Sequence, residues 1–445
     1  MMGRTFSIGG IHPHDNKISA NAAIEDFPVM EYAYISVAQH LGAPAEPIVA
    51  KGDKVKAGQL IAKANGFISA NVHSSVSGEV IAIERRPDLA GNMVPHIVIK
   101  VDGDEWDESI DRSPEVVREI KLDAKAIIDK IGECGIVGLG GAAFPTNVKL
   151  SPPRGKKAEF LLVNGAECEP YLTSDFRIMV ENTEEILIGT KIMMRALGVS
   201  KAYLGIEENK PEAVRKMAEL AGRDYKDIEI VKLKKRYPQG GEKQLIDAIL
   251  RRRVPSMGLP IDTGVVVQNV GTALAVYEAV QKNKPLFEGI VTVTGRCMTE
   301  QRNFRLRVGT KFDTIMFAIG GFPKDAVKLI SGGPMMGKSV STMEAASVKS
   351  TSAFLLLTEE ETKRVDEGNC IRCAKCVEAC PMGLEPYLLN RLTRAGDRLD
   401  LLEANSVQDC IECGSCIFSC PAHIPLLDTI RISKLQVLKI IRGRK

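Results

Sequence analysis

The sequence lacks three features that would assign it to a common class at once. No apolar run reaches the length that a membrane-spanning helix needs, and Met1–Thr5 lack the apolar core of a signal peptide. The formal net charge is only +3, and no basic stripe precedes the extreme C-terminus, so a nucleic-acid partner is not expected. The six histidines, among them His12, His14 and His73, show no metal-ligand spacing. These absences predict a soluble or peripheral protein of the cytoplasm.

The cysteines are distinctive in number and placement. There are eleven: Cys134, Cys168 and Cys297 stand alone, and eight form two groups of four near the C-terminus. A disulfide framework would be spread through a small secreted chain, so this distribution indicates metal chemistry in a reducing compartment. We expect Cys134 and Cys168 to be buried, inert thiols.

The two groups share one spacing, Cys-x-x-Cys-x-x-Cys-x-x-x-Cys-Pro, at 370–381 and 410–421. Such a run gives three thiolates from one loop to a [4Fe–4S] cluster, while its fourth cysteine ligates the other cluster. The proline suits the first helical position, where a missing N–H costs nothing. The predicted ligands are, for one cluster, Cys370, Cys373, Cys376 and Cys420, and for the other, Cys380, Cys410, Cys413 and Cys416.

A structural zinc site is the competing interpretation of these cysteines. Zinc sites use two Cys-x-x-Cys pairs, often with histidine, and have no use for a run of four cysteines with a fixed third spacing. The iron–sulfur interpretation is therefore favoured. Two clusters in one small fold predict electron transfer.

Strand and helix patterns divide the rest of the chain. Residues 28–101 show short strands around glycine turns, and they resemble the barrel-sandwich of lipoyl and biotinyl domains. Lys63 is the candidate for a lipoylated lysine, but the acidic lysine hairpin is missing, so a packing or docking domain is favoured. Residues 115–285 alternate strands and helices, which predicts an α/β domain with a largely parallel sheet. Residues 286–333 return to strands, as in a small α+β module, and the charged residues 359–367 suit a linker.

Two glycine-rich segments match nucleotide-binding patterns. Gly138–Ala143 fits Gly-x-Gly-x-x-Ala, but Asp123–Gly132 before it looks helical and Pro145 follows it, so a classical Rossmann turn is not favoured. Its backbone amides are still candidates for cradling a phosphate. Gly332–Ser339 fits the P-loop pattern, but the following segment, 340–352, is a poor phosphate-capping helix, so a tight structural turn is favoured.

Four motifs from Gly138 to Thr272 resemble, in the same order, the NADH-oxidising FMN subunit of respiratory complex I. In order they are Gly138–Lys149, Val163–Pro170, Gly240–Glu242 and Val267–Thr272. The domain order narrows the resemblance, which covers nearly the whole chain, to the C-subunit family of the Rnf electron-transport complex. A cobalamin reductase of bacterial microcompartments shares the parts but places its barrel after the flavin domain.

The resemblance implies a multidomain α/β fold. The implied parts are an N-terminal segment and barrel-sandwich domain over 1–110, a Rossmann-like FMN/NAD(H)-binding domain over 111–285, a β-grasp (SLBB) module over 286–355, a ferredoxin domain with two [4Fe–4S] clusters over 356–430, and a basic amphipathic tail over 431–445.

The resemblance also implies noncovalent FMN with NAD(H) beside it. The FMN contacts would come from Gly138, Gly140, Gly141, Lys149, Asn164, Gln268, Asn269 and Thr272. Phe144 would stack on adenine, Glu207 or Glu208 would bond a ribose hydroxyl, and the catalytic carboxylates Glu167 and Glu169 would face the nicotinamide.

Each of these roles has a structural alternative. Phe144 could belong to the core, Lys149 could be a solvated surface lysine, and Glu207 and Glu208 could be loop carboxylates. Ala166 and Gly271 replace acidic residues of the family, so the nicotinamide side departs further from the family pattern than the flavin side.

The main functional hypothesis is a peripheral subunit that passes electrons between NAD(H) and two clusters through FMN, which converts hydride chemistry to single electrons. The implied partners are NAD(H), other membrane subunits of the complex and ferredoxin, with ion translocation in the complex and a location on the cytoplasmic face of the membrane. The alternatives are an NADH flavoprotein that reduces cobalamin, and a non-catalytic electron carrier whose nucleotide pocket is vestigial, consistent with Ala166.

The C-terminal segment, Ile430–Lys445, combines apolar residues at helical spacing with many positive charges. It suits either an anionic membrane surface or membrane partner, or a final helix packed on the ferredoxin domain.

Overall fold

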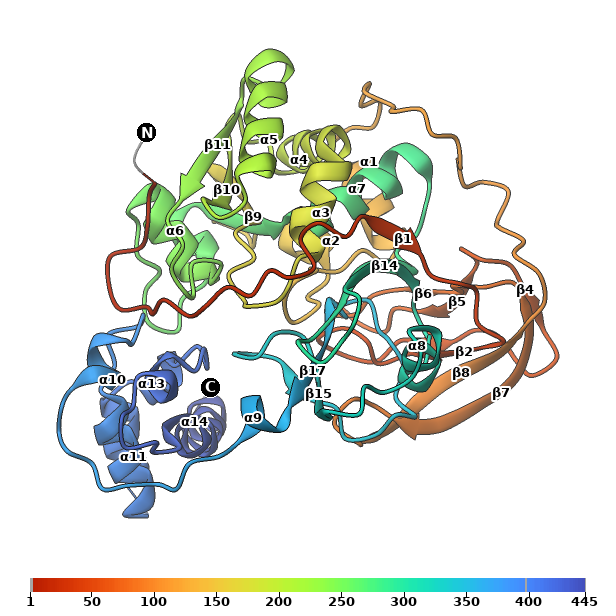
Figure 1. Ribbon diagram of the computed structural model, residues 1–445. Helices are drawn as coiled ribbons and strands as arrows, with labels where there is room; N and C mark the ends of the chain where they lie inside the picture. Colours follow the sequence, from red (N-terminus) through yellow and green to blue (C-terminus); the bar gives the residue numbers. More distant parts are fainter. Residues whose placement is uncertain (1–2, 397, 445) are drawn as a thin grey trace.

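The computed structural model describes residues 3–396 and 398–444 (Figure 1). Residues 1–2, in the predicted first domain, 397, in the predicted ferredoxin domain, and 445, in the predicted tail, lie outside the described residues. The chain forms four bodies, which follow one another in the colours of Figure 1 from orange through green and teal to blue.

The first body is a sandwich of two small antiparallel sheets, as expected for residues 28–101. One sheet has the order β2-β8-β7-β4 and the other β3-β5-β6. Alternate residues of the strands, such as Ala33 and Ile35, and Ile97 and Ile99, point inward and are fully buried. The strands are β2 (Tyr32–Ser36), β3 (Glu46–Pro47), β4 (Lys54–Val55), β5 (Leu60–Lys63), β6 (Val72–His73), β7 (Gly78–Pro87) and β8 (Met93–Val101).

The second body is an α/β domain around a parallel sheet of order β11-β10-β9-β12, as the alternating pattern predicts. Leu161 and Val163 pack on one face of the sheet and Leu162 on the other. This domain positions the predicted flavin residues at the carboxyl ends of its strands. Its elements are α1 (Ala124–Glu133), α2 (Thr146–Lys149), β9 (Phe160–Gly165), α3 (Ser174–Glu181), α4 (Thr183–Leu197), β10 (Ala202–Glu207), α5 (Pro211–Asp224), β11 (Ile228–Leu233), α6 (Glu242–Leu250), η1 (Pro260–Thr263), β12 (Val265–Asn269) and α7 (Val270–Lys282).

The third body is a mixed sheet of order β1-β14-β13-β17-β15-β16, covered by α8. The P-loop-like Gly332–Ser339 is the turn of the β15–β16 hairpin and the start of no helix, so the prediction of a structural turn is confirmed. The elements are β1 (Ile24–Asp26), β13 (Glu288–Thr294), β14 (Arg302–Arg307), α8 (Phe312–Ala318), β15 (Ala326–Ser331), β16 (Lys338–Ser339) and β17 (Ala353–Thr358).

The fourth body, at the lower left of Figure 1, carries the two cysteine runs as a repeat of backbone conformation. Arg372 and Glu412, 40 positions apart, both have positive φ, and so do Ala374 and Gly414. Within each run, the two residues with positive φ precede a one-turn helix, which is α10 in the first run and α13 in the second. The third cysteine of the run lies on that helix. The elements are α9 (Glu359–Thr362), α10 (Lys375–Glu378), α11 (Pro386–Arg394), α12 (Leu399–Ala404), η2 (Val407–Asp409), α13 (Ser415–Phe418) and α14 (Leu426–Gly443).

One face of helix α14 supports the second interpretation of the tail, a final helix packed on the ferredoxin domain. Leu426, Ile430 and Val437 are buried against the ferredoxin domain, and Lys434 donates to the carbonyl O of Cys410 (2.8 Å). Ile432 and Leu435 lie exposed on the opposite side. Among the helices of the described residues, none is both long and apolar enough for a membrane span.

The N-terminal segment 3–23, which we call the strap, joins three of the bodies (Figure 1). Arg4 pairs with Leu233 at the end of β11, and the N–H of Gly10 donates to the carbonyl O of Ala379 in the ferredoxin domain (2.9 Å). The strap then leads into β1, which pairs in parallel with β14. Sequence patterns of helix and strand did not indicate these contacts.

Candidate flavin and iron–sulfur sites

The glycine loop between α1 and α2 is a tight turn with one open side. The N–H of Gly138 donates to the carbonyl O of Phe144 (2.8 Å), which closes the turn. Gly140 has a φ of +71°, and a Cβ there would lie 2.9 Å from Nδ2 of Asn269. Gly141 is exposed, and a Cβ added to it would have no atom within 4 Å. The loop therefore places glycine backbone, without side chains, at the carboxyl ends of the strands, and it leaves open space beside Gly141.

The polar residues predicted for FMN meet this loop at the ends of β9 and β12. Asn164 and Asn269 are paired in the sheet register. Asn269 caps α7 by accepting from the N–H of Gly271 (2.7 Å), and the Thr272 hydroxyl accepts from the N–H of Leu139 (2.9 Å). The structure thus brings together residues that lie more than a hundred positions apart.

Two buried polar atoms at this place have no partner among the described residues. They are Nε2 of Gln268 and the hydroxyl of Thr146, whose side chains are almost fully buried. A buried donor without a partner costs about 1–3 kcal/mol, so such groups usually mark the place of a missing polar ligand or water. The site therefore fits a ligand with polar ring and phosphate atoms, such as FMN. Gln268 was predicted as a flavin contact, whereas Thr146 lies in the first motif but was assigned no role.

Lys149 and Phe144 are half-buried at the edge of the same site. The Lys149 ammonium is paired with Oε1 of Glu242 (2.7 Å), in the first turn of α6. Contact with a phosphate would replace this ion pair, which is partly exposed and therefore weak.

The two carboxylates predicted to face the nicotinamide accept hydrogen bonds from backbone N–H groups. Glu167 accepts from the N–H of Asp175 (2.7 Å) at the start of α3. Glu169 accepts from the N–H of Met335 (3.1 Å) and of Met336 (2.8 Å) in the β15–β16 hairpin. Glu169 therefore holds the β-grasp module to the flavin domain, and its role toward the nicotinamide stays a prediction.

The structure separates the two candidates for ribose binding. The side chains of Glu207 and Lys210 are each 2% exposed and form an ion pair at 3.5 Å. Glu208, the next residue, is exposed. Glu207 is the last residue of β10 and is engaged by Lys210, so it is not a loop carboxylate. Glu208, just after the strand, is the carboxylate open to a ligand.

A network of buried charges lies behind these loops. Burial, and then repulsion by Glu167, raises the pKa of Asp175 to about 7, although Asn269 donates to its carboxylate (2.7 Å). Burial likewise raises the pKa of Glu169 to about 7 and lowers the pKa of Lys17 to about 8. The Lys17 ammonium donates to the carbonyl groups of Glu167, Glu169 and Leu172. The segment that follows β9 is thus anchored by the strap.

Four of the cysteines line one small cavity of about 20 Å³ in the ferredoxin domain. They are three from the second run and the fourth from the first run, which is the crossed set predicted from the spacing. We call this set, Cys380, Cys410, Cys413 and Cys416, the inner cysteine site. Burial raises the pKa of the Cys410 thiol to about 11, and burial with neighbouring thiolates raises that of Cys416. Iron binding would offset this cost, because cationic metal favours the thiolates and displaces their protons.

The other four cysteines, Cys370, Cys373, Cys376 and Cys420, are the outer cysteine site. Cys370 and Cys373 are exposed, Cys376 is buried and Cys420 is half-buried. Cys420 is near enough to Cys376 to raise the pKa of its thiol, after burial, which is the larger cause. No group of three or more His, Cys, Asp or Glu side chains in residues 3–396 and 398–444 is arranged to hold a single metal ion.

The inner cysteine site lies against the flavin domain. The buried Tyr237 hydroxyl donates to the carbonyl O of Cys413 (2.8 Å), and Gln244 donates to that of Pro381 (3.3 Å). Tyr237 also pairs with Ile11 of the strap. Three segments that are distant in sequence therefore fix this cysteine loop beside the flavin domain.

Comparison with known proteins agrees with this arrangement. The chain matches the Nuo51 FMN-binding domain over residues 131–278 and the RnfC barrel sandwich hybrid domain over 5–104. It also matches the SLBB domain over 290–339 and the 4Fe-4S dicluster domain over 369–424. It is 46% identical over 387 residues to the C subunit of the proton-translocating ferredoxin:NAD(+) oxidoreductase complex of Clostridium ljungdahlii, with 86% of this chain and 83% of that one covered. The chain belongs to the RnfC family.

Other members of this family are similarly close. The C subunit of the Na(+)-translocating ferredoxin:NAD(+) oxidoreductase complex of Acetobacterium woodii is 44% identical, with 97% of this chain and 96% of that one covered. The C subunit of the ion-translocating oxidoreductase complex of Rhodobacter capsulatus is 41% identical, with 88% and 76% covered. An NAD+-reducing [NiFe]-hydrogenase structure aligns with a TM-score of 0.48 at 18% identity, over 71% of this chain and 61% of that one, which is too distant to support an argument.

The family membership confirms the fold class, the cofactors and the electron-transfer function that the sequence motifs predicted. This member of the RnfC family is a peripheral electron-transfer subunit of an oxidoreductase complex, with an FMN-binding domain and a domain for two [4Fe–4S] clusters. The positions of individual ligands remain predictions from the residues described above.

Proposed function

We propose that this chain is itself an NAD(H)-linked flavoprotein, and that its cysteine sites form an ordered path away from the flavin, first the inner and then the outer. The observation that carries the proposal is the hydrogen bond from Tyr237 of the flavin domain to the carbonyl O of Cys413. This contact supports the inner cysteine site as the first acceptor of electrons from the flavin. FMN, when bound, supplies the exchange between hydride transfer and single electrons, and the clusters carry single electrons.

In this proposal, the residues of the chain hold and orient the cofactors. Gly138, Gly140 and Gly141 bring backbone amides to the FMN phosphate, with Lys149 as the cation. The amides of Asn164, Gln268 and Asn269 and the hydroxyl of Thr272 position the ring. Phe144 stacks on the adenine of NAD(H), and Glu208, rather than the buried Glu207, accepts from a ribose. Glu167 and Glu169 shape the nicotinamide side.

The exposed outer site is the natural point of exchange with other redox proteins. Cys370 and Cys373 are at the surface, whereas Cys413 and Cys416 are buried. The relatives are named as parts of ion-translocating ferredoxin:NAD+ oxidoreductase complexes, so the proposed partners are membrane subunits of such a complex and ferredoxin. The proposed location is the cytoplasmic face of the membrane, where NAD(H) is available.

Anaerobic addition of NADH to the purified protein with FMN tests the proposal. The flavin absorbance should bleach, and both clusters should then become reduced, as followed by electron paramagnetic resonance. A flavin that stays oxidised under NADH would contradict the proposal and support the non-catalytic alternative.

Gly140→Ala tests the flavin loop. Its Cβ would lie 2.9 Å from Nδ2 of Asn269 at a φ of +71°. Strain of this kind costs about 1–2 kcal/mol, so FMN should bind roughly tenfold more weakly, as measured by flavin fluorescence titration. Gly155→Ala is the matched control, because its φ is +83° and no atom lies within 4 Å of its Cβ position. Equal FMN affinity in the two variants would remove the loop from the site.

A further inference from the structure

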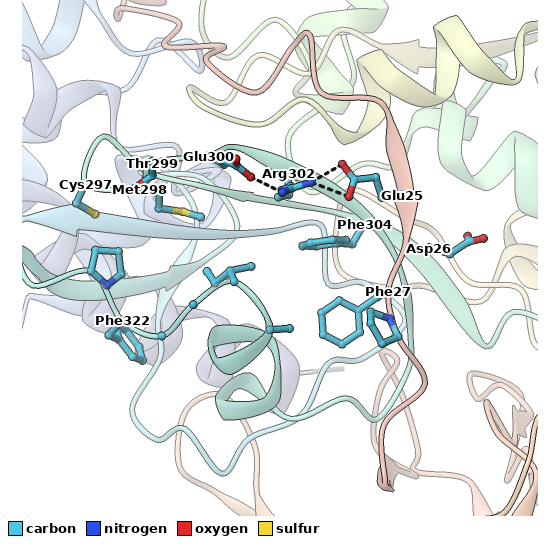
Figure 2. Close-up of a pocket in the computed structure, with 16 residues that line it drawn as sticks. Glu25, Asp26, Phe27, Cys297, Met298, Thr299, Glu300, Arg302, Phe304 and Phe322 are labelled. Carbon is cyan, nitrogen blue, oxygen red and sulfur yellow. Dashed lines mark hydrogen bonds and ion pairs between the residues drawn. The ribbon is translucent and has the colours of Figure 1, made fainter.

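A cleft of about 540 Å³ opens on the β-grasp module (Figure 2). Its walls are β1 with Pro28, the turn 297–300 between β13 and β14, and the segment 318–323 at the end of α8. This volume is within the range of sites that bind ligands or side chains of a partner. None of the residues predicted for NAD(H), FMN or iron lines it.

One part of the cleft is aromatic. Phe27 and Phe304 form an edge-to-face pair with ring centroids 5.2 Å apart, and Phe322 lies across from them (Figure 2). The Phe322 side chain is 47% exposed. Partly exposed aromatic faces bind apolar groups and the stems or heads of cationic side chains.

The other part of the cleft has an excess of negative charge. Glu25, Asp26 and Glu300 line it with a single cation, Arg302, and Asp26 pairs with Arg305 outside the lining (3.3 Å), so three carboxylates share two cations. Both oxygens of Glu25 contact Arg302 at 2.8 Å, and Glu300 pairs with the same guanidinium. Since Arg302 is already shared by two carboxylates, the lining favours a positively charged occupant.

The apolar surface continues beyond the cleft. Phe317, on α8 one residue before the wall, is 85% exposed, and Val327, at the start of β15, is exposed as well. A small molecule in the cleft would leave these side chains in water, whereas a polypeptide crossing the cleft would cover them. The surface thus suits a chain segment with both apolar and basic residues.

We propose that the cleft receives a Lys/Arg-rich segment next to a membrane helix of another subunit, and so fixes this chain to its complex. Membrane proteins carry an excess of Lys and Arg in the short loops on the cytoplasmic side, directly beside apolar helix ends. That combination matches the aromatic and acidic halves of the cleft. The inference rests on the proposed function as a peripheral subunit at the cytoplasmic face.

Reversal of two exposed charges tests the inference in the assembled complex. Asp26 and Glu300, with side chains 87% and 68% exposed, would be changed to give the double variant Asp26→Lys/Glu300→Lys. With the complex purified through a tag on a membrane subunit, recovery of this chain should fall roughly tenfold, because like charges then face each other. The control is Glu108→Lys/Glu119→Lys, whose side chains are 90% and 77% exposed outside the cleft.

The isolated double variant should still show NADH-dependent flavin bleaching. Loss of recovery with intact bleaching therefore reports docking alone, whereas failure of bleaching in the wild type would concern the proposed function. Equal recovery of the double variant and its control would overturn the docking inference.

Cys297 offers a second measurement without a docking variant, because its half-buried thiol lines the cleft. A thiol reagent followed by peptide mass spectrometry should modify Cys297 in the isolated chain and leave it protected in the complex, with Cys297→Ser identifying the peptide. Equal modification in both states, or protection in the isolated chain, would overturn the inference.

Discussion

The inner and outer cysteine sites share one sequence motif but differ in their surroundings. The inner site lines a small cavity and is fixed by Tyr237 of the flavin domain, by Gln244 and by the strap. The outer site follows the exposed segment 363–369, and two of its cysteines are at the surface. The motif thus specifies that clusters are bound, whereas the packing of other domains specifies which of them is next to the flavin.

The largest expected effect comes from substitution of the fourth cysteine of each run, because each substitution should remove one cluster and leave the other. Cys380→Ser should remove the inner cluster, although the other three inner ligands belong to the second run, because Cys380 lines their cavity. Cys420→Ser should remove the outer cluster. Each variant should lose half of the iron, as measured by iron analysis. In anaerobic protein reduced by NADH, Cys380→Ser should also leave the remaining cluster oxidised, whereas Cys420→Ser should leave it reducible.

One outcome of this experiment would contradict the crossed assignment of the cysteines to the two clusters. If Cys380→Ser and Cys373→Ser disturbed the same cluster in paramagnetic resonance spectra, each run would hold its own cluster. The flavin should bleach with NADH in all of these variants, which controls for folding of the flavin domain.

Tyr237→Phe should have a smaller effect, confined to the inner site. The substitution leaves the carbonyl O of Cys413 without its donor at a buried interface, which costs about 1–3 kcal/mol of stability. It should also shift the reduction potential of the inner cluster in a redox titration and leave the outer cluster unchanged. The control is Tyr225→Phe, since the Tyr225 hydroxyl donates to Glu184 (3.0 Å), which lies far from the cysteines in sequence. A shift of both clusters, or of neither, would contradict the proposed order.

A further prediction compares a buried carboxylate beside the flavin loops with an exposed one before the outer cysteine site. Burial raises the pKa of Asp175 from 3.8 to about 7. In that window the folded protein keeps a proton that the unfolded chain releases, so stability falls as pH rises from 3.8 to about 7. Asp175→Asn should remove this part of the pH dependence, as followed by thermal unfolding across the window.

The control for that prediction is Asp366→Asn, in the exposed segment before the outer cysteine site. It should leave the pH dependence of stability as in the wild type. An Asp175→Asn profile parallel to the wild type would mean that other groups, such as Glu169, carry the effect.

Much of the fold followed from local patterns. Asp123–Gly132 was expected as a helix and corresponds to α1, and the alternation of strands and helices over 115–285 corresponds to the α/β domain. The spacing of the cysteines predicted the crossed set that the cavity brings together. These features depend on periodicity, on turn residues and on ligand spacing, which are all local in sequence. The charged segment 359–367 was expected as a linker, but its first four residues form α9, because Thr358 and Glu361 make a capping box.

The contacts between domains could not be predicted in the same way. Glu169 resembles a cofactor carboxylate in sequence, yet it accepts from Met335 and Met336, more than 160 positions away. Thr146 lies within the motif Gly138–Lys149, but the motif does not show that its hydroxyl is buried without a partner. Such roles depend on tertiary packing, and neither periodicity nor composition records which distant segment reaches a given side chain.

The strap has a consequence for the synthesis of the chain. Its residues are made well before its partners, which are Leu233, Asn303 of β14 and Ala379. Contacts at such sequence separation form slowly, and domains generally fold in the order of their synthesis. The N-terminal segment therefore takes its place last, after the ferredoxin domain has emerged. Its contacts then fix the inner cysteine loop only after the ferredoxin domain has been made.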